Sequence, residues 1–220
     1  MPEKTIHSVR EFSGQLIQLD VLEVELENGR RTRREIVRHP GAVAIWARVP
    51  DGRFVFVRQF RKAIEQELLE VVAGTREAGE TPEACARREI REETGYTVKT
   101  LAPLGFIFTA PGFCAERIAI FYAELAKNGP ADPDPDECLD VVLLDEAAWK
   151  AMMFCGAVQD AKTWAAWGMF ETRRRTADNR RRTADDRRRT ADDKRRTADD
   201  RRRTADDRRR MKKGRIKTTA

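Results

Sequence analysis

The sequence has few residues of the kinds that mark several common protein classes. It contains only two histidines, His7 and His39, which argues against a His-rich zinc site and a Ser-His-Asp triad. Any metal chemistry must then rest on carboxylates. The four cysteines are scattered without a CxxC pair, as expected of reduced thiols in a cytosol. These are Cys85, Cys114, Cys138 and Cys155.

Long apolar stretches are also missing. A membrane-spanning helix needs about 20 consecutive apolar residues, and the apolar runs of this chain are far shorter. The first fifteen residues, MPEKTIHSVREFSGQ, contain no apolar stretch of the signal-peptide kind. We therefore expect a cytoplasmic protein with no membrane partner.

Charge is abundant but unevenly placed. Charged residues make up 36% of the 220 residues and give a net charge of +6, compared with about 25% in typical globular chains. Residues 171–220 hold 22 basic and 10 acidic side chains, a net of +12, so the first 170 residues carry −6. With 40% hydrophobic residues, the chain can build one core. An acidic body is thus followed by a basic tail.

The tail is a seven-residue repeat of the form Thr-Ala-Asp-Asp/Asn-Arg/Lys-Arg-Arg. Alanine is the only apolar residue in each unit, so the apolar seam of a coiled coil cannot form. We expect residues 171–220 to be disordered or a solvated helix, either without function or binding an anionic partner. The five units begin at Thr176, Thr183, Thr190, Thr197 and Thr204.

The first 170 residues alternate strand-like and helix-like segments without a regular βαβ rhythm. Asn28-Gly29 predicts a hairpin within residues 15–37, and Val49-Pro50-Asp51-Gly52 predicts a second one joining residues 42–48 and 54–60. The order of segments favours an α+β fold with a mixed sheet sandwiched by helices. Further strands are expected at 68–72, 104–109, 117–126 and 139–144, and helices at 145–154 and 160–170.

The strongest helix signal covers residues 81–94. Thr81 can cap the amino end, Pro82 suits the first helical position, and Gly95 can adopt the left-handed stop conformation. Glu89, Glu92 and Glu93 share one face of this helix because positions i, i+3 and i+4 are neighbours. The carboxylates repel one another near an unfavourable helix end, and Mg²⁺ or Mn²⁺ would remove that penalty. A solvated face with Glu–Arg pairs is the alternative.

The wider pattern around this helix resembles the Nudix box. It reads Gly74, five residues, Glu80, seven residues, then Arg88-Glu89-Ile90-Arg91-Glu92-Glu93-Thr94-Gly95-Tyr96. Tyr96 departs from the usual aliphatic residue. The resemblance implies a Nudix-like fold and an enzyme that hydrolyses a nucleoside diphosphate linked to another group.

The resemblance also implies roles for residues of the box. The metal, Mg²⁺ with Mn²⁺ as an alternative, would be held by the carbonyl of Ala73 and by carboxylates. Arg88 would orient the glutamates rather than touch the substrate. The implied carboxylate ligands are Glu89, Glu92 and Glu93, with Glu92 and Arg88 also serving catalysis.

Other segments are similar to the ADP-ribose pyrophosphatase branch of the family. Pro111 lies sixteen residues after Gly95, a spacing that marks this branch, and segments 39–43, 57–61 and 68–74 agree with it. The likeness covers about residues 15–170 and implies cleavage of ADP-ribose to AMP and a sugar phosphate. The implied substrate contacts are Arg34, Glu35, Arg61, Glu116 and the turn Ala110, Pro111 and Gly112.

The water-activating base is expected in the acidic loop of residues 132–137. Glu137 aligns with an acidic metal-binding or catalytic position, while Pro135 stands where relatives have a catalytic glutamate. Glu137, Asp134 or Asp136 could take that role. A polar loop without catalytic function is the alternative.

The same resemblance suggests three parts and a homodimer. Residues 1–40 would form a strand region that reaches across to a partner subunit, 41–170 the Nudix domain and 171–220 the tail. GDP-mannose, another nucleotide sugar or an oxidised nucleotide is an alternative substrate. A different class of function is a Nudix-fold nucleotide sensor whose tail binds nucleic acid.

Overall fold

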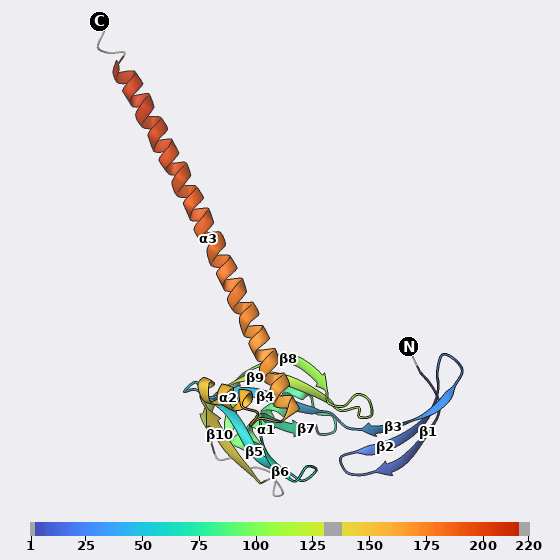
Figure 1. Cartoon of the computed structure of the whole chain (residues 1–220). Helices are drawn as coiled ribbons and strands as arrows, with labels where there is room; N and C mark the ends of the chain where they lie inside the picture. Colours follow the sequence, from blue (N-terminus) through green and yellow to red (C-terminus); the bar gives the residue numbers. More distant parts are fainter. Residues whose placement is uncertain (1–2, 130–137, 216–220) are drawn as a thin grey trace. The chain divides into compact units, whose positions relative to one another are not determined.

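The computed structural model describes residues 3–129 and 138–215 of the chain (Figure 1). It divides into two compact units, residues 1–171 and residues 172–220. The body contains both sheets, and the tail is helical as far as Arg215. Among the described helices, none is both long enough and apolar enough to cross a membrane.

The core of the body is a mixed sheet of seven strands. Its main order is β10-β5-β4-β9-β8, with β6 paired to β5 and β7 paired to β4. The pairing of β4 with β9 is parallel, and the other pairs are antiparallel. The strands are β4 (Ala42–Arg48), β5 (Phe54–Arg61), β6 (Gln66–Glu70), β7 (Val72–Thr75), β8 (Tyr96–Phe108), β9 (Arg117–Asn128) and β10 (Leu139–Leu144).

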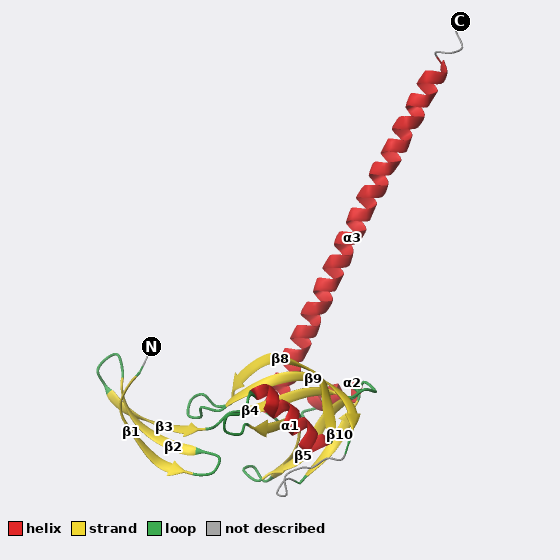
Figure 2. Ribbon diagram, turned by 180° about the vertical axis from the view of Figure 1, so that it is seen from behind, coloured by secondary structure: helices red, strands yellow, loops and turns green. Residues whose placement is uncertain are grey.

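Helices cover both faces of this sheet, which confirms the predicted α+β sandwich. Successive side chains of a strand point to opposite faces: in β4, Trp46 packs in one apolar cluster and Ile45 in the other. The Ile45 cluster includes α1 (Pro82–Thr94), and the Trp46 cluster includes α2 (Glu146–Phe154) and the start of α3 (Ala161–Arg215). Figure 2 shows α1 in front of the sheet. Figure 1 gives the view from the opposite side and shows α2.

A separate antiparallel sheet of three strands precedes the mixed sheet. It is formed by β1 (Lys4–Ser13), β2 (Gln18–Glu25) and β3 (Arg31–Arg38), in that order. The predicted hairpin joins β2 and β3, and Gly29 has the positive φ of 77° that the turn requires. Every side chain of β1 is exposed, so the strand has no alternating buried face.

Several element boundaries differ from the sequence expectation. Residues 66–75 form two strands that meet at Val71, instead of one strand over 68–72. Strand β8 begins directly after the helix stop at Gly95, and α3 continues past residue 170 without a break. The strand boundaries follow from pairing with neighbouring strands, and the length of α3 follows from an uninterrupted run of helix-forming residues. Neither is determined by a turn signal.

Candidate active site

Local sequence fixes the start and the end of α1. The Thr81 hydroxyl accepts a hydrogen bond from the Ala84 N–H at 3.2 Å, and Pro82 opens the helix. Gly95 has φ 71°, and its N–H donates to the carbonyl of Arg91 at 2.9 Å. The predicted caps are confirmed. They fix where the helix begins and ends, and the side chains of Glu89 and Glu93 on it are buried.

Gly74 and Glu89 approach each other closely across the loop before α1. A Cβ atom at position 74 would lie 1.9 Å from the Glu89 carboxyl group, which is far inside van der Waals contact. The residue exposures of Glu89 and Glu93 are only 6% and 2%. Glycine at this position is therefore a steric requirement of the buried Glu89 carboxylate.

Arg88 gathers the acidic side chains of the loop and helix. Its Nε and Nη2 donate to the two carboxylate oxygens of Glu80 at 3.0 and 3.1 Å. Its Nη1 lies 2.7 Å from Glu89 Oε1 and donates to Glu92 Oε2 at 2.9 Å. The hydrogen bonds that Arg88 donates lower the pKa of Glu80 to about 2, and donating to the carboxylates of Glu80 and Glu92 raises the pKa of Arg88.

A pocket of about 380 Å³ opens beside this loop. Of the residues implied by the resemblance, Ala73, Arg61 and Glu116 line it, and so does Gly74 of the box. Glu116 accepts a hydrogen bond from the Thr109 hydroxyl at 2.8 Å. The other lining residues include His39, Gln59, Asp160 and Lys162.

Two cations that line the pocket, Arg61 and Lys162, hold a buried carboxylate between them. Arg61 donates to both oxygens of Glu70 at 2.8 and 2.6 Å, and Lys162 also donates to Glu70. Burial raises the pKa of Glu70, but Arg61 and Lys162 outweigh it, so the pKa lies below its ordinary value. Sequence reasoning assigned no role to Glu70 or Lys162. A glutamate inside the apolar run 68–72 was the available signal, because a buried charge needs a partner.

The start of α3 is attached to the strand end that leads into the box. The Thr163 hydroxyl accepts a hydrogen bond from the Val71 N–H at 2.9 Å and donates to Asp160 at 2.6 Å. Asp160 also accepts from the Thr163 N–H at 2.9 Å, and Lys162 donates to it at 3.0 Å. Thr163 is fully buried. The position of Lys162 in the pocket thus depends on a contact with the bend between β6 and β7.

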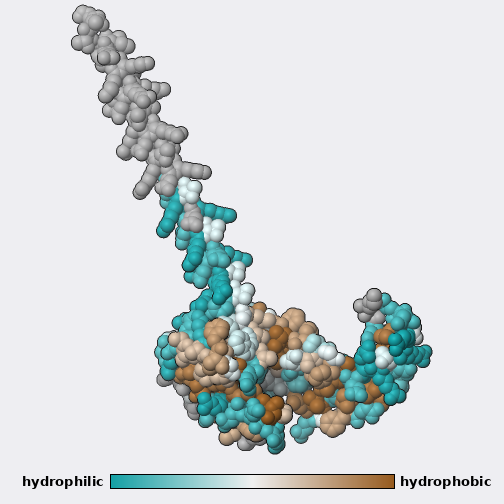
Figure 3. Space-filling model, viewed as in Figure 1, coloured by the Kyte–Doolittle hydropathy of each residue, from teal (hydrophilic) through white to brown (hydrophobic). Residues whose placement is uncertain are grey.

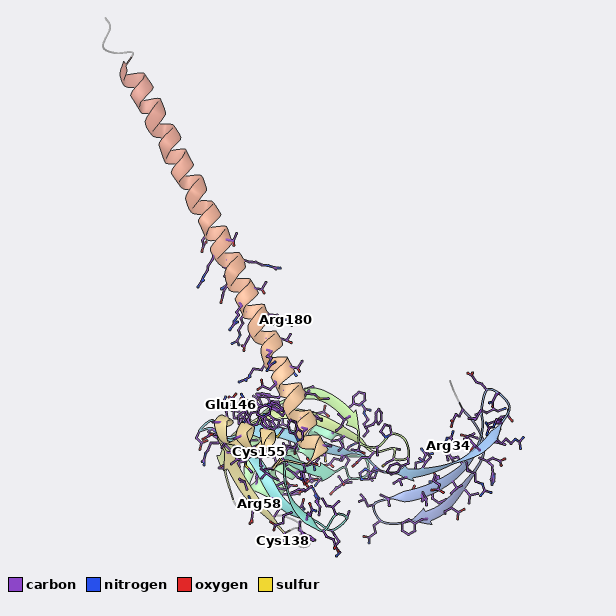
Figure 4. The ribbon with its side chains drawn as sticks, viewed as in Figure 1. Arg34, Arg58, Cys138, Glu146, Cys155 and Arg180 are labelled. Atoms are coloured by element: carbon purple, nitrogen blue, oxygen red, sulfur yellow. The ribbon has the colours of Figure 1, made fainter. Side chains whose placement is uncertain are left out.

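The remaining residues of the implied substrate site lie outside the pocket lining of this single chain. Arg34 is on β3 (Figure 4), where its guanidinium pairs with both oxygens of Glu3 at 3.0 and 2.6 Å. Glu35 is its neighbour on the same strand. The turn Ala110, Pro111 and Gly112 is closed by the Cys114 N–H, which donates to the Ala110 carbonyl at 2.8 Å. Residues 132–137, including Glu137, lie outside the described residues.

The region that contains the glycine loop and the helix of buried carboxylates matches a known family. The model of the NUDIX domain matches residues 37–164. This chain belongs to the Nudix family. The match ends before the repeats of the tail, and it includes every residue of the box.

The chain is similar to two curated relatives, and its fold is similar to that of one solved structure. The chain is 43% identical to an ADP-ribose pyrophosphatase of Bacillus subtilis (strain 168), over 74% of this chain and 89% of the relative. It is 44% identical to a methanol dehydrogenase activator of Bacillus methanolicus, over 66% and 80%. A crystal structure of an ADP compounds hydrolase superposes with a TM-score of 0.68 at 21% identity, covering 78% and 94% of the two chains.

Nudix hydrolases generally need divalent metal ions, and the residues of the box fit one. Glu89 and Glu93 offer buried carboxylate oxygens. Because Gly74 has no Cβ atom, the Glu89 carboxyl group can lie directly against the loop. Within the described part of the chain, no three acidic, histidine or cysteine side chains form a metal cage by themselves. Mg²⁺ typically uses one or two carboxylates together with substrate phosphates and water, so the donor set suits it.

Proposed function

We propose that this Nudix enzyme hydrolyses the pyrophosphate bond of ADP-ribose or a similar nucleoside diphosphate sugar, giving AMP and a sugar phosphate. The observation that supports this most is the pocket beside Gly74, which places Arg61 and Glu116 next to the box. The Bacillus subtilis relative named ADP-ribose pyrophosphatase covers the same region of the chain.

The proposed metal is Mg²⁺, with Mn²⁺ as an alternative. The ligands would be the Ala73 carbonyl and the carboxylates of Glu89, Glu92 and Glu93, with Glu137 as a further acidic ligand. Bound there, the metal would neutralise phosphate charge and lower the pKa of an attacking water. Arg88 keeps Glu89 and Glu92 oriented through the contacts at 2.7 and 2.9 Å.

The chain itself would bind and orient the substrate from the pocket walls. Arg61 donates to Glu70 through Nε and Nη2, which leaves Nη1, as far as the described residues go, for a phosphate oxygen. The planar guanidinium suits such a contact. Glu116 can accept hydrogen bonds from ribose hydroxyls. The turn Ala110–Gly112, with Pro111 at its centre, would border the sugar, and Arg34 and Glu35 would contribute from β3.

The proton acceptor for the water belongs to the acidic loop that lies outside the described residues. We propose Glu137 for it, with Asp134 and Asp136 as the alternatives. Only substitution can separate these three, because all of them are carboxylates within one stretch of four residues.

We also propose that the enzyme is a cytoplasmic homodimer. Residues 1–40 would be the strand region, residues 41–170 the Nudix domain and residues 171–220 the tail. The apolar side chains of Val9 and Phe12 on β1 are 41% and 53% exposed, which suits a strand that contacts a second copy. In such a dimer, β3 could bring Arg34 to the pocket of the partner.

A substrate panel with Mg²⁺ tests the activity. Purified protein is incubated with ADP-ribose, GDP-mannose, an oxidised nucleotide and nucleoside triphosphates, and released phosphate esters are measured. We expect the highest kcat/KM with ADP-ribose. A preference for triphosphates would contradict the proposal, and so would binding of ADP-ribose without turnover, which would indicate a sensor.

The metal ligands are tested by Glu93→Gln. The amide keeps the shape of the side chain but removes the charge that a divalent cation needs, so hydrolysis should fall at least about 100-fold with an unchanged circular dichroism spectrum. Glu83→Gln, on the exposed first turn of the same helix, is the matched control and should retain its activity. Near-normal turnover of Glu93→Gln with Mg²⁺ would show that the ligand assignment is wrong.

A further inference from the structure

The basic repeats of the tail have no part in the proposed hydrolysis. They follow the region that matches the Nudix domain, residues 37–164, and belong to the second compact unit. The chain there continues as the α-helix α3, and the described side chains from Thr172 to Asp185 are all exposed. Because the helix is regular, its geometry determines which residues lie next to each arginine on the helix surface.

In the first two repeats, the threonine hydroxyl is hydrogen-bonded to the backbone of the helix itself. The Thr176 hydroxyl donates to the Thr172 carbonyl at 2.8 Å, and the Thr183 hydroxyl donates to the Asn179 carbonyl at 2.9 Å. Because these hydroxyls fold back onto the backbone, they present no donor to a partner. The charged residues are therefore the groups that can recognise one.

The three arginines of a repeat are not equivalent. On a helix, side chains contact those three and four positions away. Arg182, the third arginine of its unit, has Asp178 four residues before it and Asp185 three residues after it. Arg181 has the same two aspartates as neighbours, at three and four positions. The aspartates can thus neutralise the second and third arginines.

The first arginine of a repeat has no acidic neighbour at these spacings. For Arg180 the four positions are Thr176, Ala177, Thr183 and Ala184. Arg187 has the same surroundings of threonine and alanine. Figure 4 shows Arg180 on the side of α3. The net charge is +2 in the first repeat, where Asn179 stands in place of a second aspartate, and +1 in each of the other four. This excess is concentrated at the one helical position that has no acidic neighbour at these spacings.

This position recurs along a single line of the helix, which we call the arginine row. With a rise of 1.5 Å per residue, seven residues advance about 10.5 Å, and the line drifts by only about 20° per repeat. Among the described members of the row, Arg180 and Arg187 are exposed beside small alanine side chains. In sequence, the row comprises Arg180, Arg187, Lys194, Arg201 and Arg208.

We propose that the arginine row binds the phosphate backbone of a nucleic acid. A phosphodiester chain is a linear polyanion, and a straight row of cations at a constant spacing complements it along its length. Guanidinium groups bind phosphate oxygens through paired hydrogen bonds. The repeats contain no aromatic residue to stack on bases, so binding is independent of nucleotide sequence and sensitive to salt.

A lipid surface fits the row less well than a nucleic acid does. Helices that lie on membranes insert an apolar face, and alanine is the only apolar residue of a repeat. Figure 3 shows the described part of the tail as hydrophilic or neutral, without a hydrophobic patch. The tail therefore offers charge to a polyanion but no apolar surface for insertion.

The test compares two variants of the full-length chain that have the same net charge. Arg180→Gln with Arg187→Gln removes two members of the row, and Arg182→Gln with Arg189→Gln removes two arginines that have aspartate neighbours. Binding to labelled duplex DNA, duplex RNA and single strands is measured by fluorescence anisotropy at salt concentrations from about 25 to 200 mM, a range over which phosphate contacts weaken strongly. Hydrolysis of ADP-ribose is measured in parallel and should be unchanged in both.

We expect the wild-type chain to bind DNA, RNA or both, with affinity that falls steeply with salt. The row variant should lose on the order of tenfold in affinity, and its slope of log K against log salt should fall by about 2. The control variant should remain closer to wild type. Equal losses in both variants, no binding at the lowest salt, or tighter binding to anionic vesicles than to nucleic acid would overturn the proposal.

Discussion

At the scale of single residues, the site depends on one absent side chain. Gly74 allows the carboxyl group of Glu89 to occupy the space where any other residue would place its Cβ atom. Arg88 then fixes that carboxylate through Nη1 at 2.7 Å. A residue without functional groups is thus as necessary for the geometry of the box as the charged residues.

We predict that Gly74→Ala lowers metal-dependent hydrolysis at least about tenfold while the protein stays folded. The new methyl group meets the end of a flexible side chain rather than backbone, so Glu89 can move aside and lose its place. Gly168→Ala, where a Cβ atom meets nothing within 4 Å, is the control. Steady-state kinetics and thermal melting of both variants provide the measurement, and full activity of Gly74→Ala would contradict the close approach.

At the scale of elements, the start of α3 contributes to the pocket through one buried threonine. Thr163 connects the bend at Val71 to Asp160, at 2.9 and 2.6 Å. Lys162 on the same turn reaches Glu70, which also holds Arg61. The last helix and the strand before the box are therefore positioned together.

We predict that Thr163→Val lowers the free energy of unfolding by about 1–3 kcal/mol, because the buried Val71 N–H loses its acceptor in a side chain of the same shape. Activity should fall as well, since Lys162 loses its anchor. Thr176→Val in the exposed tail should change stability by less than about 0.5 kcal/mol. Denaturant unfolding measures both, and equal stabilities of the two variants would refute the role of the Thr163 hydroxyl.

The elements that could be predicted from sequence are those determined by neighbouring residues. Helix α1 was predictable because Thr81, Pro82 and Gly95 act within a few positions of one another. The contact of Lys162 with Glu70 joins residues 92 positions apart, and no local signal encodes such a pairing. The candidate site was identified from the spacing of the box, whereas the network around Glu70 needed the tertiary structure.

At the scale of the whole molecule, β1 presents an exposed edge. It is the outer strand of the three-stranded sheet, and its ten residues are all exposed. Unpaired edge strands with apolar side chains are prone to associate. Pairing with a second copy would cover this strand in the proposed homodimer.

We predict that Phe12→Lys shifts the protein from dimer to monomer, because it introduces charge into the apolar surface of β1. Phe154→Lys, at a residue of α2 that is 71% exposed, is the control and should leave the mass unchanged. Light scattering coupled to gel filtration measures the mass over a range of concentrations. A monomeric wild-type chain at all concentrations would disprove the proposed assembly.

The parallel pairing of β4 with β9 has a consequence for synthesis of the chain. Ala42 is paired with Ile118, so the central strand must wait for a long segment to be translated before it finds its neighbour, and such distant pairings form slowly. Ile118 follows Ala42 by 76 residues. At about 5–20 residues per second, their translation takes roughly 4–15 s, during which β4 is already synthesised but its parallel neighbour is not.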